Sequence, residues 1–190
     1  MKTDPNLPLL EEAVAKLAPF LQEIVFVGGI TVGLLITDPA ADPIRQTNDV
    51  DVIAEIVTSA DYVRFSERLR NANFTEDMSE RPILCRWHHE ELVLDVLPVE
   101  KHILGFTNPW YKGALNAASS LTLPSGSTIS VITAPFFLGT KMEAFRGRGK
   151  TISSPATILR MSSQSWMDVT PSLMKFRPHP PTSASTSPTQ

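Results

Sequence analysis

Two short stretches of the chain combine the residue types that bind metal ions and phosphate groups. Asp49 and Asp51 lie two positions apart inside an apolar run, and in a β-strand such residues project from the same face. Neighbouring carboxylates on an apolar element repel each other and lose hydration, so they need a compensating cation. Gly28 and Gly29 end an earlier apolar run and let a phosphate approach the backbone closely. Together these residues predict Mg²⁺-dependent chemistry on a nucleotide.

A third carboxylate, Asp95, interrupts the apolar run 92–97. A strand this apolar gains no stability from an aspartate unless the carboxylate is paired or binds a metal. If this strand lies beside the strand of Asp49 and Asp51, the three carboxylates converge and can bind two Mg²⁺ ions. Asp95 could then also help to remove the proton of an attacking hydroxyl. A single aspartate would more simply cap or end a strand, but three behind a glycine pair favour a functional site.

The strands and helices that must position these side chains can be predicted from apolar spacing. Helices are expected over residues 8–23, 30–36, 59–71 and 134–146, and strands over residues 24–27, 50–56, 83–87, 92–97 and 128–132. Residues 88–91 are expected to form the turn of a hairpin, which makes the sheet mixed rather than purely parallel. Strands that alternate with helices predict an α/β fold.

The composition limits the classes of protein to which the chain can belong. With 190 residues, of which 42% are hydrophobic, the chain is long enough for one domain with a substantial core. A formal net charge of -3 gives no general attraction to nucleic acid, so such a contact requires a local basic patch. The single cysteine, Cys85, excludes an intramolecular disulfide and fits a reducing cytosol. No apolar run is long enough to cross a bilayer, so we expect a cytoplasmic protein without a membrane partner.

The sequence changes character after Lys150. From residue 151 onward Asp168 is the only acidic residue, and serine, threonine and proline dominate. We therefore expect a folded domain over residues 1–150 and an atypical, largely disordered tail over residues 151–190.

The order of the glycine pair, the Asp-x-Asp pair and the later aspartate resembles the nucleotidyltransferase superfamily, of which DNA polymerase beta is a distant member. The flanking residues narrow the resemblance. Residues 45–51 resemble the Arg-x-Thr-x-Asp-x-Asp stretch of abortive-infection (AbiEii-type) toxins and of minimal nucleotidyltransferases. Residues 134–145 resemble a later helix of these proteins, in which a lysine precedes a small residue and an arginine. The similarity covers roughly residues 20–150.

The resemblance implies a polymerase-beta-like fold, with a mixed sheet flanked by helices, and a role for each matching residue. Two Mg²⁺ ions would be bound by the carboxylates of Asp49, Asp51 and Asp95, which also form the catalytic set. A nucleoside triphosphate would be bound by Gly28, Gly29, Arg45, Thr47 and Lys141. Two of these side chains also have simpler interpretations, a solvated helix lysine for Lys141 and a loop-stabilising hydrogen bond for Arg45.

The implied reaction moves a nucleoside monophosphate from a nucleoside triphosphate to a hydroxyl group. The relatives imply a toxin-like role, an acceptor that is an RNA end or a protein side chain, and an antitoxin partner. Two alternatives remain open at this point. One is an enzyme that modifies a small molecule, as antibiotic-modifying relatives do. The other is a nucleotide- or protein-binding remnant with impaired catalysis.

The tail departs from the implied family. Related proteins continue after the basic turn at residues 146–150 into a helix with an acidic Ser-His-Asp-x-Glu-Asp motif, which this chain lacks. The codons for residues 155–168 can nevertheless encode this motif in another reading frame. Read from the third base of the Pro155 codon, suitable codons give SHDIEDVIAVVDGR, and the following codons through Lys175 add HPELDE. We hypothesise a frameshift near Lys150, in the gene or in its determined sequence, which would put catalytic activity in doubt.

Several other residues have a functional and a structural interpretation. Trp87, Trp110 and Tyr111 could stack on a base, although large aromatic residues more often pack in the core or at its rim. His88 and His89 are expected in an exposed polar turn rather than in a metal site. Cys85 is expected to pack as a small hydrophobic residue.

Overall fold

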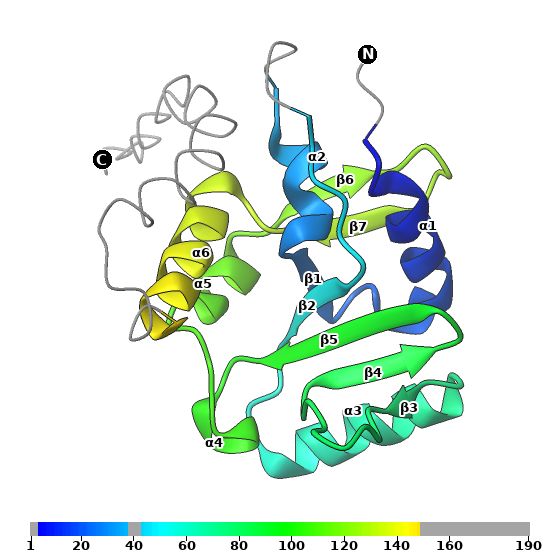
Figure 1. Ribbon diagram of the computed structural model, residues 1–190, viewed down its shortest axis with the longest axis vertical. Helices are drawn as coiled ribbons and strands as arrows, with labels where there is room; N and C mark the ends of the chain where they lie inside the picture. Colours follow the sequence, from blue (N-terminus) through cyan, green and yellow to red (C-terminus); the bar gives the residue numbers. More distant parts are fainter. Residues whose placement is uncertain (1–3, 38–42, 149–190) are drawn as a thin grey trace, which may run out of the picture.

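The computed structural model describes residues 4–37 and 43–148, which fold around one mixed seven-stranded sheet (Figure 1). The strands are β1 (Ile24–Val27), β2 (Val50–Ala54), β3 (Thr75–Glu76), β4 (Arg86–His89), β5 (Leu92–Pro98), β6 (Ser119–Thr122) and β7 (Thr128–Val131). Their order across the sheet is β3-β4-β5-β2-β1-β7-β6. Strand β2 pairs antiparallel with β1 and parallel with β5, so the sheet is mixed, as the sequence predicts.

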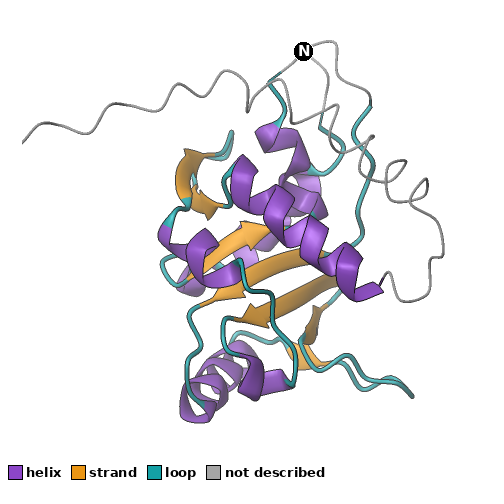
Figure 2. Cartoon of the chain, turned by 90° about the vertical axis from the view of Figure 1, so that its left-hand side faces the viewer, coloured by secondary structure: helices purple, strands orange, loops and turns teal. Residues whose placement is uncertain are grey.

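The helices pack around this sheet, which Figure 2 shows as one layer. They are α1 (Leu7–Lys16), α2 (Val32–Leu35), α3 (Ser59–Asn71), α4 (Lys101–Leu104), α5 (Tyr111–Asn116) and α6 (Ala134–Arg148), with single 3₁₀ turns η1 (Ala18–Phe20) and η2 (Gly29–Thr31). Figure 1 shows α1 beside the β6–β7 hairpin and α3 next to β3 and β4. Helix α5 lies against α6. No helix in the described part of the chain has the length and apolar character needed to span a membrane.

The hydrophobic core surrounds the central strands. All four residues of β1 are buried, and β2 and β5 are buried along most of their length. A strand covered on both faces has an almost continuously apolar sequence. An aspartate within such a strand is therefore unusual. Trp87, Phe26 and Phe20 are among the largest fully buried side chains.

Two expected elements have the predicted bounds. Strand β1 covers residues 24–27, and helix α3 covers residues 59–71. Helix α3 begins with a capping box, in which the Thr58 hydroxyl accepts a hydrogen bond from the Asp61 N–H and the Asp61 carboxylate accepts one from the Thr58 N–H. Reciprocal capping of this kind fixes the first turn of a helix.

Other expected elements differ in extent. The helix expected over residues 8–23 ends at Lys16, because Pro19 has no N–H to continue its hydrogen bonding. The helix expected over residues 30–36 is a 3₁₀ turn followed by the four-residue α2. The first strand of the hairpin begins at Arg86 rather than at residue 83 and runs to His89. The expected tail, residues 151–190, and its proposed frameshift lie outside the described residues.

The prediction that His88 and His89 form an exposed turn is wrong. Both continue strand β4 and are partly buried, and the turn consists of Glu90 and Glu91 alone. Glu90 has a φ of 54°, the left-handed conformation that a short hairpin turn requires. The His89 and Phe74 rings pack edge-on, with their centres 5.0 Å apart. A cross-strand pairing that extends to His89 therefore overrides the polar character of this segment.

Candidate functional site

The three aspartates meet because of the pairing of strands β2 and β5. These strands are parallel, and Asp51 lies directly opposite Asp95 in their register. Asp49 precedes β2 by one residue. Since alternate residues of a strand share a face, the side chains of Asp49 and Asp51 lie on the side of the sheet that also carries Asp95.

Gly28 provides the space that the Asp51 carboxylate occupies. Its φ is 74°, and a Cβ atom built on it would lie 1.8 Å from Asp51 Oδ2. Both the backbone conformation and the close approach therefore require glycine at this position. The backbone then turns into η2, where the Thr31 hydroxyl donates a hydrogen bond to the Gly28 carbonyl oxygen at 3.0 Å. The glycine pair thus lies next to the carboxylates at the end of β1.

Asp49 is oriented by the residues just before it. The Thr47 hydroxyl donates a hydrogen bond to Asp49 Oδ1 at 2.7 Å, and the Thr47 N–H donates one to Asn6 Oδ1 at 2.9 Å. Asn6 is almost fully buried, and its side-chain amide also donates to the Arg45 carbonyl oxygen at 3.1 Å. Thr47 therefore positions Asp49, whereas the Arg45 side chain is exposed to solvent.

Arg86 makes the closest contacts with Asp95. Its Nε and Nη2 atoms donate hydrogen bonds to the two Asp95 carboxylate oxygens, each at 2.8 Å. Nη2 also lies 3.6 Å from Asp49 Oδ2. The paired charge of Asp95 raises the pKa of Arg86 further above its usual value. The guanidinium group therefore lies between two of the three carboxylates.

The sequence interpretation missed Arg86, although a usable signal is present. Arg86 and Asp95 are direct partners in the antiparallel β4–β5 register. In a hairpin whose turn is residues 90 and 91, His89 pairs with Leu92, and three residues further from the turn on each strand Arg86 pairs with Asp95. Asn6 was also missed, and no local pattern links it to Thr47, because the two residues are far apart in the sequence.

The electrostatics of the site disfavour the ionised form of Asp51. Burial raises the pKa of Asp51 to about 6, and the negative charges of Asp49 and Asp95 contribute in the same direction. The positive charges of Lys141 and Arg86 act in the opposite direction. A cation at the Asp49–Asp51 pair would relieve the repulsion that remains.

Lys141 reaches this region from helix α6. The positive charge of Lys141 lowers the pKa of Asp51, against the larger effect of burial. The same ammonium lies 5.5 Å from the centre of the Phe137 ring. The Lys141 side chain is exposed to solvent.

The donor set fits a divalent cation in part. Asp49 and Asp51 offer hard carboxylate oxygens of the kind that Mg²⁺ prefers, and Gly28 leaves the backbone close to the Asp51 carboxylate. Both oxygens of Asp95 instead accept hydrogen bonds from Arg86. Within residues 4–37 and 43–148, no three His, Cys, Asp or Glu side chains are arranged to hold one ion together.

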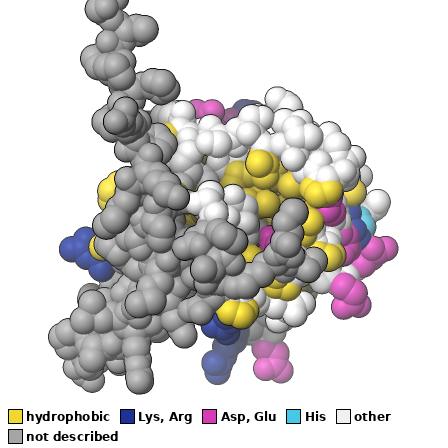
Figure 3. All heavy atoms as spheres, turned by 90° about the horizontal axis from the view of Figure 1, so that it is seen from above, with side chains coloured by type: hydrophobic (Ala, Val, Ile, Leu, Met, Phe, Trp, Pro, Cys, Tyr) yellow, Lys and Arg dark blue, Asp and Glu magenta, His cyan; other side chains and the backbone are white. Residues whose placement is uncertain are grey.

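The aromatic residues near the site differ in accessibility. Trp87 is 1% exposed and belongs to the core, in agreement with its structural interpretation. Trp110 is 45% exposed and packs edge-on against Phe136, with ring centres 6.2 Å apart. Tyr111 is partly buried, and burial together with the charge of Asp51 raises its pKa. Figure 3 shows hydrophobic side chains grouped on the face seen from above.

Cys85 lies beside the site but is buried. Burial, together with the charge of Asp95, raises the pKa of its thiol to about 11. The thiolate form needed for nucleophilic or metal-binding chemistry is therefore rare near neutral pH. This agrees with the interpretation of Cys85 as a packing residue.

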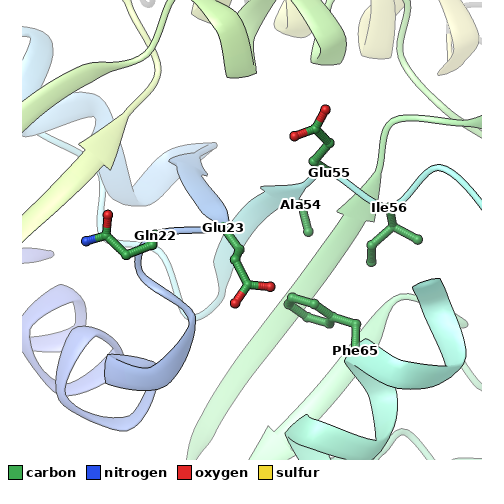
Figure 4. A pocket seen from close by; sticks show the side chains of 6 residues that line it. All are labelled: Gln22, Glu23, Ala54, Glu55, Ile56 and Phe65. Carbon is green, nitrogen blue, oxygen red and sulfur yellow. The ribbon is translucent and has the colours of Figure 1, made fainter.

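A cavity of about 280 Å³ lies at the other end of the β1–β2 pair (Figure 4). It is lined by Gln22, Glu23, Ala54, Glu55, Ile56 and Phe65. Ala54 ends strand β2 and pairs with Ile24, whereas Asp51 pairs with Val27 at the opposite end. The cavity is therefore separate from the carboxylates.

Comparison with known proteins identifies a similar fold. No protein-family model and no curated protein sequence matches the chain. A solved structure of an antigenic nucleotidyltransferase-like protein from Paracoccidioides brasiliensis superimposes with a TM-score of 0.54. The two sequences are 16% identical, and the alignment covers 95% of this chain and 81% of the other. At this identity the similarity shows that the two proteins share a fold.

Proposed function

We propose that this chain is a Mg²⁺-dependent nucleotidyltransferase, which transfers a nucleoside monophosphate from a nucleoside triphosphate to a hydroxyl group. The observation that carries this proposal is the convergence of Asp49 and Asp51 with Asp95 on one side of the sheet, where Gly28 closely approaches the Asp51 carboxylate. The shared fold with a nucleotidyltransferase-like protein supports it at a coarser level.

Each residue of the site has a distinct part in this proposal. Asp49 and Asp51 would hold Mg²⁺, which neutralises phosphate charge and makes the acceptor hydroxyl more acidic when it is bound. Thr47 keeps the Asp49 carboxylate in one orientation through its 2.7 Å hydrogen bond. The backbone at Gly28 and Gly29 approaches the triphosphate, and the exposed Lys141 ammonium attracts it.

The reaction is an in-line displacement at the α-phosphorus atom. The acceptor hydroxyl oxygen forms a bond to this phosphorus, and the bond from the phosphorus to the bridging oxygen of the β-phosphate breaks. Pyrophosphate leaves with the bonding electrons, and the hydroxyl proton passes to solvent or to a nearby base. Positioning and charge stabilisation by the side chains supply most of the catalysis in reactions of this kind.

The acceptor is proposed to be an RNA end or a protein side chain, in keeping with the toxin-like relatives that the motifs resemble. In that role the chain would be restrained by an antitoxin. Incubation of the purified protein with nucleoside triphosphates labelled at the α-phosphate, Mg²⁺ and total RNA tests this directly. Label in RNA supports the nucleic-acid acceptor, and label in the protein fraction supports a side-chain acceptor.

Two controls decide whether any labelling comes from this site. Asp49→Ala removes a proposed metal ligand, so labelling should fall to the background of a reaction without Mg²⁺. Glu67→Gln changes the charge of an exposed residue on α3, outside the site, and should leave labelling unchanged. Transfer to an added aminoglycoside, without label in RNA or protein, would instead identify a small-molecule enzyme.

A second candidate function, nucleotide binding without catalysis, is favoured by one observation. Arg86 engages both oxygens of Asp95, so this carboxylate is already neutralised by a hydrogen-bonded cation. A binding remnant would retain affinity for a nucleoside triphosphate, measured by calorimetry, and would show no transfer of label. An active enzyme would show both.

A further inference from the structure

We propose that this site binds a single divalent cation, on Asp49 and Asp51, and that the Arg86 guanidinium supplies the second positive charge at Asp95. This inference rests on the proposed function. It assigns to Arg86 a role that a second metal ion would otherwise fill.

The register of the β4–β5 hairpin makes the contact between Arg86 and Asp95 a built-in feature. The two residues are direct cross-strand partners, so their side chains lie on the same face of the sheet. The backbone after Arg86 is fixed by pairing that continues to His89, and just before it the Cys85 carbonyl oxygen accepts a hydrogen bond from the Val96 N–H at 2.8 Å. The contact is therefore set by the pairing of the strands and does not depend on a flexible loop.

The geometry of the contact leaves Asp95 with little capacity to bind a metal. The planar guanidinium group presents two N–H donors, and each reaches a different carboxylate oxygen at 2.8 Å. Such bidentate arginine–carboxylate pairs are among the strongest hydrogen-bonded ion pairs in proteins. Asp95 is 8% exposed, so water competes weakly for the pair. A metal ion at Asp95 would have to displace this pair.

The position of the charge is the second argument. Arg86 Nη2 lies 3.6 Å from Asp49 Oδ2 as well as 2.8 Å from Asp95 Oδ2. The guanidinium group therefore lies between these carboxylates, where a bridging ion would otherwise be expected. Two cations in the same small space repel each other. Arg86 donates both of its recorded hydrogen bonds at this site to Asp95, so the carboxylate oxygens of Asp49 and Asp51 remain the ones that a metal ion can approach without displacing a hydrogen-bonded arginine.

The experiment counts bound Mn²⁺, a spectroscopic substitute for Mg²⁺, on the full chain in the absence of nucleotide. Equilibrium dialysis at increasing Mn²⁺ concentration, with free ion measured by electron paramagnetic resonance, gives the number of ions per chain. We expect one ion for the wild-type protein and none for Asp49→Asn combined with Asp51→Asn. We expect two ions for Arg86→Gln, because Asp95 is then released.

The matched control is Arg68→Gln. Arg68 also forms a bidentate ion pair, in which its Nη1 and Nη2 atoms each donate a hydrogen bond to a Glu23 carboxylate oxygen at 2.7 Å. Glu23 lines the cavity at the opposite end of β1 and β2, away from the site. This variant should bind one ion, like the wild type. A gain of an ion in this variant would show that loss of any arginine pair creates a site, and would overturn the assignment to Arg86.

A further variant guards against misfolding of Arg86→Gln, which leaves the Asp95 carboxylate buried without its partner. Arg86→Gln combined with Asp95→Asn replaces the ion pair by two amides that can still bond to each other. It should bind one ion, because Asp49 and Asp51 are untouched. Binding of no ion by this folded variant would show that Asp95 is a required ligand and would overturn the proposal.

The remaining outcomes separate this inference from the function on which it rests. Two ions on the wild-type protein overturn the inference alone, since a nucleotidyltransferase with two metals would remain. One bound ion on a folded Arg86→Gln variant also overturns the inference, because Arg86 would then not be what prevents a second ion from binding at Asp95. No bound Mn²⁺ on the wild-type protein overturns both the inference and the proposed metal-dependent function.

Discussion

Replacement of Asp51 by asparagine should stabilise the metal-free protein. Asp51 is partly buried beside Asp49 and opposite Asp95, and its pKa in the folded chain is about 6 instead of the ordinary 3.8. Above pH 6 the folded state therefore holds a negative charge that the unfolded chain accommodates more easily. An asparagine side chain keeps the size of the aspartate without its charge, so the Asp51→Asn protein should unfold less readily.

The magnitude follows from the pKa of Asp51. One pKa unit corresponds to about 1.4 kcal/mol, so the full shift would cost about 3 kcal/mol at neutral pH. Asp51 retains some contact with solvent, which screens part of this cost. We therefore expect Asp51→Asn to raise the free energy of unfolding by roughly 1–3 kcal/mol at pH 7.5.

The pH dependence of this effect has a definite sign. A raised pKa in the folded state means that folding binds a proton between about pH 4 and pH 6. The Asp51 contribution to stability is therefore present below pH 4, is lost as the pH rises through 6, and is constant above 7. The difference in stability between Asp51→Asn and wild type should increase across this window.

Urea denaturation with EDTA, at several values of pH, measures these differences. Glu67→Gln, on the exposed side of α3, controls for the loss of one negative charge and should change stability little. Added Mg²⁺ should stabilise the wild-type protein and have a much smaller effect on Asp51→Asn. If Asp51→Asn is less stable than wild type at pH 7.5 without metal, the reasoning about the charge of Asp51 is wrong.

Three further predictions concern the residues around the site and the tail. Gly28→Ala should lower the free energy of unfolding by about 1–3 kcal/mol, measured by urea denaturation, because Cβ would meet the Asp51 carboxylate in a backbone conformation with φ 74°. The Cys85 thiol should react with a disulfide reagent at pH 8 at least about tenfold more slowly in the folded than in the unfolded protein, since burial raises its pKa to about 11. Resequencing of the gene across codons 145–175 should reveal a downstream frame able to encode SHDIEDVIAVVDGR, and a frame unable to encode it would reject the frameshift.

Local patterns in the sequence were sufficient to locate the carboxylates. The two-residue spacing of Asp49 and Asp51 and the isolated Asp95 are properties of single strands, and the structure brings Asp51 opposite Asp95. The bounds of α3 also follow from local signals, because the capping residues Thr58 and Asp61 mark its start. Features of this kind depend on neighbours within a few residues.

The missed features depend on contacts between distant parts of the chain. Strand β6 is polar and mostly exposed, and it becomes a strand only by pairing with β7. The contact between Arg86 and Asp95 requires the register of a hairpin, and the anchoring of Thr47 by Asn6 requires the N-terminal segment to fold back onto the loop before β2. Tertiary pairing of this kind leaves little trace in local composition.

The most direct test of the proposed function compares transfer of an α-phosphate label by the wild-type protein and by Asp51→Asn. Both proteins should be folded, and Asp51→Asn should be the more stable, so loss of activity in this variant cannot result from unfolding. We expect Mg²⁺-dependent labelling of a macromolecular acceptor by the wild type and a decrease of at least about 100-fold for Asp51→Asn. Equal labelling by the two proteins, or no labelling by the wild type with any of the four nucleotides, would contradict the assignment of Asp49 and Asp51 to catalysis.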